Sequence, residues 1–546
     1  MKPVVGVKDP LGSNHVLKKG RSMKKYDELE YLKLSKWNKF LYRFTSFFAA
    51  IPKKLLNGVL SIGRFFKNIG LSIGREAKDI ITTFINGDWK TKISYLVMGF
   101  GCIARGQILR GILFLLFEII FIGYMITTGG YWLSMLPSLG HQGSEKVVQQ
   151  GGLNPWGGEG TGTTVTIYHD NSFKILLYGV LTLFFVVAFI YTWRANIKQN
   201  KTAEEILKTG KPIKSGKDDL RSLVDDNFHK TLLALPLTGI LVFTVMPIFF
   251  MILVAFTNYD FEHDGLITLF KWNGFTGFKE IFSWNVGGFN YSAAFGEILT
   301  WTLIWAFFAT FTNYFLGIFV AMMINKKGIK LKKLWRTVLI LTIAIPQFIS
   351  LLFVRQMFAE NGIVNGVLKD LGILAQGAKG INFLGDPNHH GLLPRIMVIL
   401  INIWIGIPYL MLIATGILMN IPADLYESSR IDGASGWKQF SKITLPYMLF
   451  ITGPYLLTSF TGNMNNFNVI YLLTGGGPDN TAINLPQTVG HTDLLITWLF
   501  KLTNSGANQK YYLASVIGIL VFLVVAVISL VVYSVLPSVK NEEDFQ

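Results

Sequence analysis

The sequence has little charge and almost no cysteine. Of its 546 residues only 15% are charged and 51% are hydrophobic, and the mean hydropathy is +0.42. Soluble globular proteins carry about 25% charged residues, so this composition indicates a membrane protein. The single cysteine, Cys102, excludes an internal disulfide and any multi-cysteine metal site.

Motifs of catalysis are also missing. No phosphate-binding loop of the form G-x4-G-K-[ST] occurs, so we expect the chain not to bind or hydrolyse ATP itself. Neither a Ser/His/Asp arrangement nor an H-E-x-x-H zinc motif is present. The adjacent His389 and His390 are interpreted as a solvated loop feature, because neighbouring side chains of extended chain point apart. Residues 1–39 lack the apolar core of a cleavable signal peptide. The pattern favours a conduit that binds no metal or cofactor of its own over an enzyme.

Eight apolar runs are long enough to cross a bilayer, which takes roughly 20 helical residues. We therefore predict an all-α integral membrane protein with eight transmembrane helices, near residues 109–127, 173–193, 232–256, 298–324, 334–358, 396–418, 447–473 and 513–536.

The charges of the connecting loops predict the orientation. Residues 194–230 carry nine Lys and Arg and residues 326–336 carry six, whereas the alternate loops carry one or two each. Positive loops stay in the cytoplasm, so both termini and the loop 423–446 are predicted to be cytoplasmic. This orientation explains the net charge of +17 better than nucleic acid binding does.

The loop 423–446 is a polar island between two apolar runs. It contains two short helical patterns, and Gly433 and Gly436 separate them because glycine tolerates the backbone angles of a sharp corner. The second pattern is predicted to stop before Pro446. A short amphipathic helix between two membrane spans is expected to dock another protein.

Here the sequence resembles a known family. Its residues match, in spacing, the motif E-A-A-x3-G-x9-I-x-L-P of the permeases of binding-protein-dependent ABC importers, at Glu427, Gly433, Ile443, Leu445 and Pro446. Three more fit the longer form found in sugar importers, namely Asp432, Ala434 and Phe440. The departure is Ser428-Ser429, where the family usually has two alanines; serine is small enough for the same close packing.

The resemblance implies the larger permease of a maltose/maltodextrin-type importer, with the type I permease fold, in a bacterial plasma membrane. Its partners would be a second homologous permease, two ATPase subunits that bind ATP and Mg²⁺, an external solute-binding protein, and an oligosaccharide substrate. Residues expected to couple the chain to the ATPase are Glu427, Ser428, Ser429, Asp432, Gly433 and Ala434.

The resemblance also gives a domain organisation. Residues 230–546 would form the six-helix permease core and residues 93–229 two additional transmembrane helices. Residues 1–92 lie outside the resemblance, and their charge and spacing predict a basic cytoplasmic region with an amphipathic helix. That helix either lies on anionic membrane lipid or packs on the protein's own cytoplasmic side. The apolar stripe of that helix consists of Ile62, Phe66, Ile69, Ile73, Ala77, Ile80 and Phe84.

A row of polar side chains marks the seventh predicted span. Spacings of four and three put Ser459, Asn463 and Asn466 on one helical face. Unpaired amides in hydrocarbon are costly, so this face either bonds to other helices or lines a polar cavity. The text N-M-N-N-F-N-V-I-Y-L-L-T-G-G-G-P resembles maltose-type permeases, which implies that the three side chains contact sugar.

Two further segments match sugar-facing positions of that family. In the sixth span these are Ile405, Gly406 and Tyr409, of which the tyrosine offers a ring for stacking on sugar. In the fifth span they are Ile343 and Gln347. A packed helix kink is the alternative for the sixth-span residues.

Only Glu118 is an ionisable residue clearly at mid-span, and it lies outside the region that matches the family core. A structural or partner-facing role is expected for it. The scarcity of such residues argues against the alternative of an ion-coupled secondary sugar transporter acting alone. A third hypothesis is a membrane scaffold whose loop only recruits a partner.

Overall fold

The structure is a computed structural model, and it describes residues 35, 63–64, 67–141, 146–149, 163–166, 170–210, 212–213, 216–283, 289–326, 328–486, 488–504 and 506–533. The chain divides into two compact units, Met1–Asp79 and Ile80–Gln546. Residues 67–86 are helical and cover the described part of the predicted amphipathic helix. Most of the basic region before it, with Ile62 and Phe66, lies outside the described residues.

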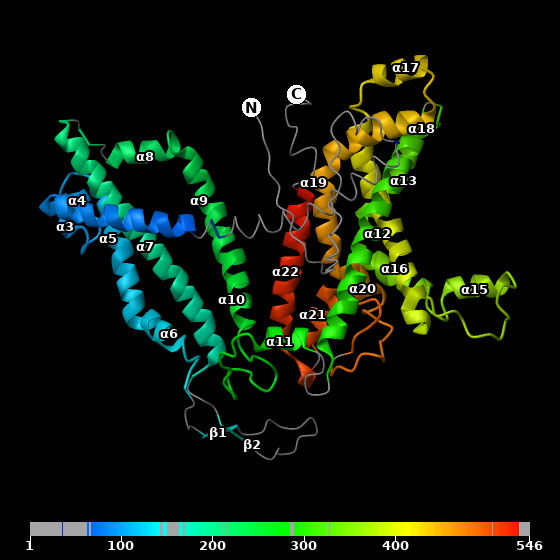
Figure 1. Ribbon diagram of the computed structural model, residues 1–546, viewed down its shortest axis with the longest axis horizontal. Helices are drawn as coiled ribbons and strands as arrows, with labels where there is room; N and C mark the ends of the chain where they lie inside the picture. The colour runs from blue at the N-terminus through cyan, green and yellow to red at the C-terminus, as the bar shows by residue number, and fades with distance from the viewer. Residues whose placement is uncertain are drawn as a thin grey trace, which may run out of the picture. The chain divides into compact units, whose positions relative to one another are not determined.

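Long apolar helices build the second unit (Figure 1). Within the described part of the chain, seven helical segments are long and apolar enough to cross a membrane. They consist of α5 (Ile108–Tyr124) with η1 (Met125–Gly129) and α6 (Gly130–Met135); α7 (Ser172–Lys208); α9 (Phe228–Ile240) with η2 (Leu241–Val245) and α10 (Met246–Val254); α12 (Tyr291–Asn325); α16 (Asn388–Leu418); α18 (Gly436–Gln439) with η3 (Phe440–Thr444), α19 (Leu445–Met464) and α20 (Phe467–Leu473); and α22 (Tyr511–Tyr533).

The fifth predicted span is not one straight helix. It consists of α13 (Lys332–Ala344) and α14 (Gln347–Met357), which are bent by 92° and make an eighth span if counted together. Ile345 and Pro346 between them have extended backbone, with ψ near 126° and 128°. Proline has no N–H for a helical bond and disfavours helix in the residue before it. The proline therefore converts an apolar run into two half-helices.

Shorter elements connect the long helices. They are α3 (Trp89–Ile93), α4 (Phe100–Ile103), α8 (Gly216–Val224), α11 (Thr276–Phe282), α15 (Ile363–Asp370), α17 (Ala423–Ile431), α21 (Leu495–Asn504) and η4 (Gly506–Asn508). The fold is almost entirely helical, as predicted. The exception is an antiparallel pair, β1 (Lys146–Gln149) and β2 (Thr163–Thr166), in register from Lys146 opposite Thr166. In Figure 1 this pair lies at the opposite end of the bundle from α8 and α17.

Helix α12 is the central helix of the core. It packs most extensively on α16 and then on α19. The close approach to α16 depends on Gly317, because a Cβ there would lie 2.6 Å from Leu410 Cβ. Buried Tyr314 of α12 hydrogen-bonds Thr452 of α19 at 2.8 Å. These contacts fix α16 and α19, which carry most of the predicted sugar residues, against α12.

The region before α9 is held by buried polar groups instead. The side chain of Arg105 is fully buried and bonds Asp88 at 2.5 Å and Asn200 at 2.8 Å. Glu118 Oε2 accepts a hydrogen bond of 2.7 Å from the backbone N–H of Met98. Glu118 thus anchors a turn of its own chain, which agrees with the structural alternative for it.

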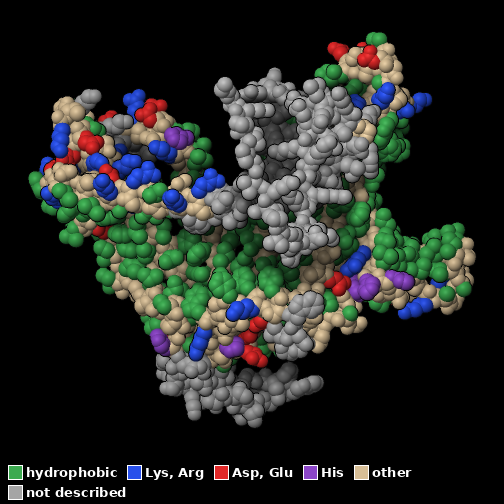
Figure 2. Space-filling model, viewed as in Figure 1, with side chains coloured by type: hydrophobic (Ala, Val, Ile, Leu, Met, Phe, Trp, Pro, Cys, Tyr) green, Lys and Arg blue, Asp and Glu red, His purple; other side chains and the backbone are tan. Residues whose placement is uncertain are grey.

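Side-chain chemistry divides the surface into zones. Figure 2 shows hydrophobic side chains over the middle of the bundle, while most of the visible Lys and Arg lie at the end with α8 and α17. An apolar belt bounded by charge is what a membrane-spanning protein presents to lipid and water.

Candidate functional site

A cleft lies at the break between α13 and α14. Its volume is about 340 Å³, and α16 forms its other wall. Four of the predicted sugar residues line it: Ile343, Gln347, Ile405 and Tyr409. They are brought together because the 92° bend turns α14 away from α13 and leaves the side chains near the break uncovered.

The cleft has the chemistry of a carbohydrate site. Tyr409 is 51% exposed and Trp404, also in the lining, is 53% exposed, so two aromatic rings are accessible. The Gln347 amide and the Ser350 and Thr342 hydroxyls add groups that donate and accept hydrogen bonds. Aromatic faces with a few polar groups suit a sugar ring and its hydroxyls. Trp404, Ser350 and Thr342 were not predicted, because only the bend brings them to the same cavity.

The polar row of α19 is largely occupied by other contacts. Asn463 Nδ2 donates to Thr310 Oγ1 of α12 at 3.0 Å, and the Asn463 carbonyl accepts from Trp305 Nε1 at 3.0 Å. Asn466 Nδ2 donates to Asn463 Oδ1 at 3.4 Å. These are contacts of the kind expected from the interhelical alternative.

The prediction that Asn466 shares a helical face with Ser459 and Asn463 is wrong. Helix α19 ends at Met464, and Asn466 is the N-cap of α20, where its side chain accepts from the N–H of Val469. Asparagine side chains compete with helical backbone bonds and favour caps. The spacing argument fails because the helix it assumed is interrupted.

Ser459 and Gly406 lie beside the cleft without lining it. Ser459 follows Tyr455 by one helical turn, and the Tyr455 ring is 6.4 Å from that of Tyr409. At Gly406 a Cβ would lie 2.3 Å from Asn313 Nδ2, so the glycine permits α12 to approach α16. This contact is of the packing kind that was the alternative stated for its segment.

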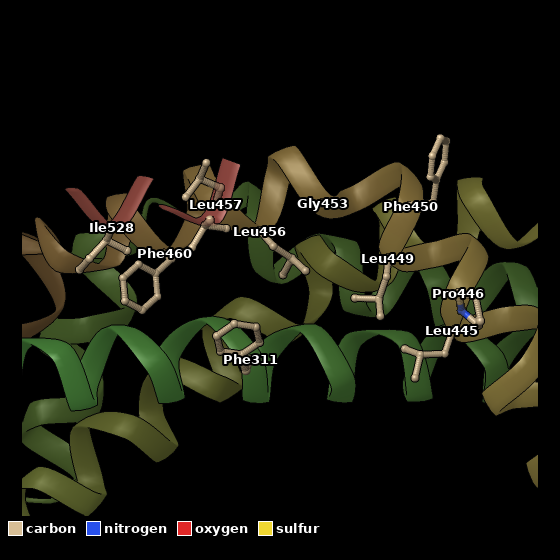
Figure 3. A pocket seen from close by; sticks show the side chains of 11 residues that line it. Phe311, Leu445, Pro446, Leu449, Phe450, Gly453, Leu456, Leu457, Phe460 and Ile528 are labelled. Carbon is tan, nitrogen blue, oxygen red and sulfur yellow. The ribbon is translucent and has the colours of Figure 1, made fainter. Parts of the chain in front are cut away.

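A larger groove runs along α19, and its character is different (Figure 3). Its volume is about 680 Å³. In Figure 3, Leu449 and Leu456 extend from α19 toward α12, from which Phe311 reaches up. The lining has no polar side chain: Phe311, Leu445, Pro446, Leu449, Phe450, Gly453, Leu456, Leu457, Phe460, Ile528 and Val532. Such a surface suits hydrocarbon and offers nothing to sugar hydroxyls.

The polar loop forms a corner of two helices. Helix α17 ends at Ile431, and Gly433 adopts φ +70°, a left-handed conformation that glycine takes without strain. Ile431 is 87% exposed and Trp437 of α18 is 73% exposed, and Glu427, Ser428 and Asp432 are exposed too. Ser429 and Ala434 are half-buried. The corner presents apolar and acidic groups together, as a docking surface does.

Two details of this loop differ from the prediction. Gly436 is the first residue of α18 rather than part of the break, and Ser435 caps that helix. The helix does not stop before Pro446 but continues through η3 into α19. The π-turn Phe440–Thr444 changes the backbone bonding just before the proline, so the missing N–H is accommodated within a continuous helix.

His389 and His390 both have left-handed backbone, at φ 50° and 57°. The ring of His390 is 6.0 Å from that of His491. Among the residues that the structure describes, no group of three or more His, Cys, Asp or Glu side chains is arranged to hold a metal.

Comparison with known proteins identifies the class. Residues 313–541 match the family described as "Binding-protein-dependent transport system inner membrane component". The maltodextrin transport system permease protein MalC of Streptococcus pneumoniae is 31% identical over 462 residues, covering 83% of this chain and 97% of MalC. The galactooligosaccharides transport system permease protein GanP of Bacillus subtilis is 34% identical over 390 residues, covering 71% of this chain and 88% of GanP.

A solved structure of a bacterial ABC transporter involved in alginate import is 23% identical, with a TM-score of 0.45, covering 58% of this chain and 97% of that one.

The fold is that of a multi-pass membrane permease, a transport subunit rather than an enzyme. The chain belongs to the permeases of binding-protein-dependent ABC sugar importers, and its type is that of the maltose/maltodextrin systems. This membership favours an ABC importer over a secondary transporter acting alone.

Proposed function

We propose that the chain is the larger permease of an ATP-driven importer for maltodextrin-like oligosaccharides. The observation that supports this substrate class most directly is the cleft at the break between α13 and α14. It combines the rings of Tyr409 and Trp404 with the amide of Gln347. The name of the similar MalC, a maltodextrin permease, points to the same substrate class.

We assign sugar contacts to the four cleft residues Ile343, Gln347, Ile405 and Tyr409. Ser459 acts beside them through the Tyr455–Tyr409 pair. For Asn463 and Asn466 direct contact with sugar stays a prediction, since their amides already bond other groups. Such contacts exchange partners when helices move between inward- and outward-open states.

The polar loop is the proposed contact to the ATPase pair. The exposed Glu427 and Asp432 with the apolar Ile431 would enter the ATPase surface, and the left-handed Gly433 would set the angle of the corner. The remaining partners are a second homologous permease and an external solute-binding protein. The loop and both termini would be cytoplasmic in a bacterial plasma membrane, as the loop charges predict.

Affinity purification in mild detergent from the native membrane tests this function. Wild-type chain is expected to retain a second permease and an ATPase with a phosphate-binding loop in stoichiometric amounts. Glu427→Lys replaces an exposed acid with a base, and we expect it to retain the permease and lose the ATPase. Proteoliposomes with the full complex should take up maltotriose only with ATP and binding protein.

A matched control reverses a charge at a position outside the polar loop. Lys326, which caps the C-terminus of α12, can be changed to Glu. That variant should retain the ATPase. Uptake of maltotriose by the purified chain alone, driven by an ion gradient, would instead establish a secondary transporter. Binding of partners without any uptake would establish a scaffold.

A further inference from the structure

Four side chains tie the two helices of the polar loop to each other. Ser429 Oγ donates to the Tyr426 carbonyl at 2.9 Å and accepts from Gln439 Nε2 at 2.8 Å. Gln439 Nε2 also approaches the Tyr426 carbonyl at 3.3 Å. The Tyr426 hydroxyl and Thr444 Oγ1 are 2.9 Å apart. We call Tyr426, Ser429, Gln439 and Thr444 the bracket.

The secondary structure explains how the bracket is aligned. Tyr426 and Ser429 are three residues apart in α17 and so share one face of it. Gln439 and Thr444 are five residues apart, which in an α-helix would separate them by about 140° around the axis. The segment between them is the π-turn Phe440–Thr444, whose bonds run from residue i to i+5. The π-turn therefore brings Gln439 and Thr444 toward the same face, opposite α17.

The corner itself is a weak connection. It consists of the few residues around Gly433, whose left-handed backbone has open space on its side-chain side. A force applied to the exposed end of α17 would pivot α17 about this corner unless other contacts held it. Thr444 is only 2% exposed, so the bracket links the exposed α17 to the buried N-cap residue of α19.

We propose that the bracket makes α17, α18 and the start of α19 move as one body, so that displacement of the loop reaches the membrane span. This inference rests on the proposed ATPase contact of the loop. The bracket residues are positioning residues, because none of them needs to touch the ATPase or the sugar. Without the bracket the ATPase still binds, but its closure turns α17 without moving α19.

A serine on the other side of the corner offers a matched comparison. Ser441 Oγ donates only within its own helical segment, to the Lys438 carbonyl at 3.4 Å, whereas Ser429 Oγ reaches Gln439 of the next helix. Ser429→Ala and Ser441→Ala thus remove the same atom from the same loop. Only the first removes a hydrogen bond between the two helices.

The experiment measures maltotriose transported per ATP hydrolysed in proteoliposomes that hold the full complex and its binding protein. A neutral hydrogen bond contributes little free energy on its own. We therefore expect Ser429→Ala and Gln439→Ala each to lower the ratio of maltotriose transported to ATP hydrolysed about threefold. The double variant should lower it no further than Gln439→Ala alone, because that change already removes the bond to Ser429. Ser441→Ala should match wild type, and Ser429→Thr, which keeps the hydroxyl, should restore the ratio.

The amount of assembled complex separates this proposal from a structural role. An unchanged ratio in Ser429→Ala and Gln439→Ala overturns the bracket, and so does an equal loss in Ser441→Ala. Loss of ATPase binding in the bracket variants, with a normal ratio in the remaining complex, also overturns it, because the bracket would then only shape the docking surface. If wild-type chain recruits no ATPase, the proposed function itself fails.

Discussion

The cleft at the α13–α14 break and the polar end of α19 contain similar residue types in opposite surroundings. In the cleft the amide of Gln347 and the ring of Tyr409 are exposed. At the end of α19 the amide of Asn463 is bonded to Thr310 of the neighbouring helix, and Asn466 caps α20. A polar side chain in a membrane span can serve packing or ligand binding, and the distance to the next helix decides which.

The apolar groove along α19 completes this comparison. It has about twice the volume of the cleft, at 680 Å³ against 340 Å³, yet all the side chains that line it are apolar (Figure 3). Size is therefore not the reason for proposing a sugar site. The reason is that accessible rings lie beside accessible hydrogen-bonding groups in the cleft.

Gly406→Leu should have the largest effect, and it acts on packing. A Cβ at this position would lie 2.3 Å from the buried Asn313 amide, so the side chain would force α12 and α16 apart at a cost of about 1–3 kcal/mol. We expect a lower thermal unfolding midpoint in detergent, with the half-saturating sugar concentration unchanged in the folded fraction. Gly416→Leu in the same helix is the control, because its Cβ would meet open space. An unchanged midpoint in Gly406→Leu would contradict the packing role.

Tyr409→Ala should affect transport rather than stability. The ring is half exposed in the cleft, so its removal leaves little cavity but loses a stacking surface. We expect the half-saturating concentration of maltotriose to rise about tenfold, which corresponds to roughly 1.4 kcal/mol. Tyr409→Phe keeps the ring, so its half-saturating concentration should rise much less. If uptake by Tyr409→Ala equals wild type, the cleft is not the sugar site.

Gln347→Ala removes one hydrogen-bonding group from the cleft wall. A single neutral hydrogen bond contributes about 0.5–1.5 kcal/mol, so we expect about a threefold rise in the half-saturating concentration. Gln356→Ala is the matched control, because Gln356 is an exposed glutamine of the same helix that does not line the cleft. Equal effects of the two changes would show that Gln347 has no special contact with sugar.

Asn463→Ala should have the smallest effect, a slightly lower unfolding midpoint. It removes an interhelical hydrogen bond to Thr310, and such bonds in membranes contribute about 0.6 kcal/mol on average. Asn465→Ala serves as the control, since the Asn465 amide bonds only within its own helix, to the Thr461 carbonyl. A raised half-saturating concentration with an unchanged unfolding midpoint would reverse the comparison and place sugar at the polar row of α19.

Particular elements show where prediction from the sequence succeeds. The apolar runs could be located because a bilayer imposes a minimum length, and the polar loop because its motif has fixed spacing. The observed contacts also agree with the alternatives stated for Glu118, which bonds the Met98 N–H, and for Gly406, which lies against Asn313. The residues near each of these positions in the sequence were sufficient for the prediction.

Prediction failed where a helix changes its course. The spacing argument placed Asn466 on the face of Ser459, but α19 ends at Met464. Hydropathy predicted a span at 334–358 but gave no sign that Pro346 divides it with a 92° bend. Proline ends some helices and is tolerated in others, as Pro408 is within α16 and Pro446 at the start of α19. The difference depends on neighbouring helices that satisfy the backbone.

Hydropathy, charge and local motifs need no knowledge of neighbours in space. They were enough to predict the class of protein, the number of apolar segments and the position of the polar loop. Packing in three dimensions was needed to show that Gln347 and Tyr409 line one cleft, that Asn463 is held by Thr310, and that Ser429 joins two helices while Ser428 does not. The reason is that a polar side chain is available to a ligand only where another helix does not already bond it.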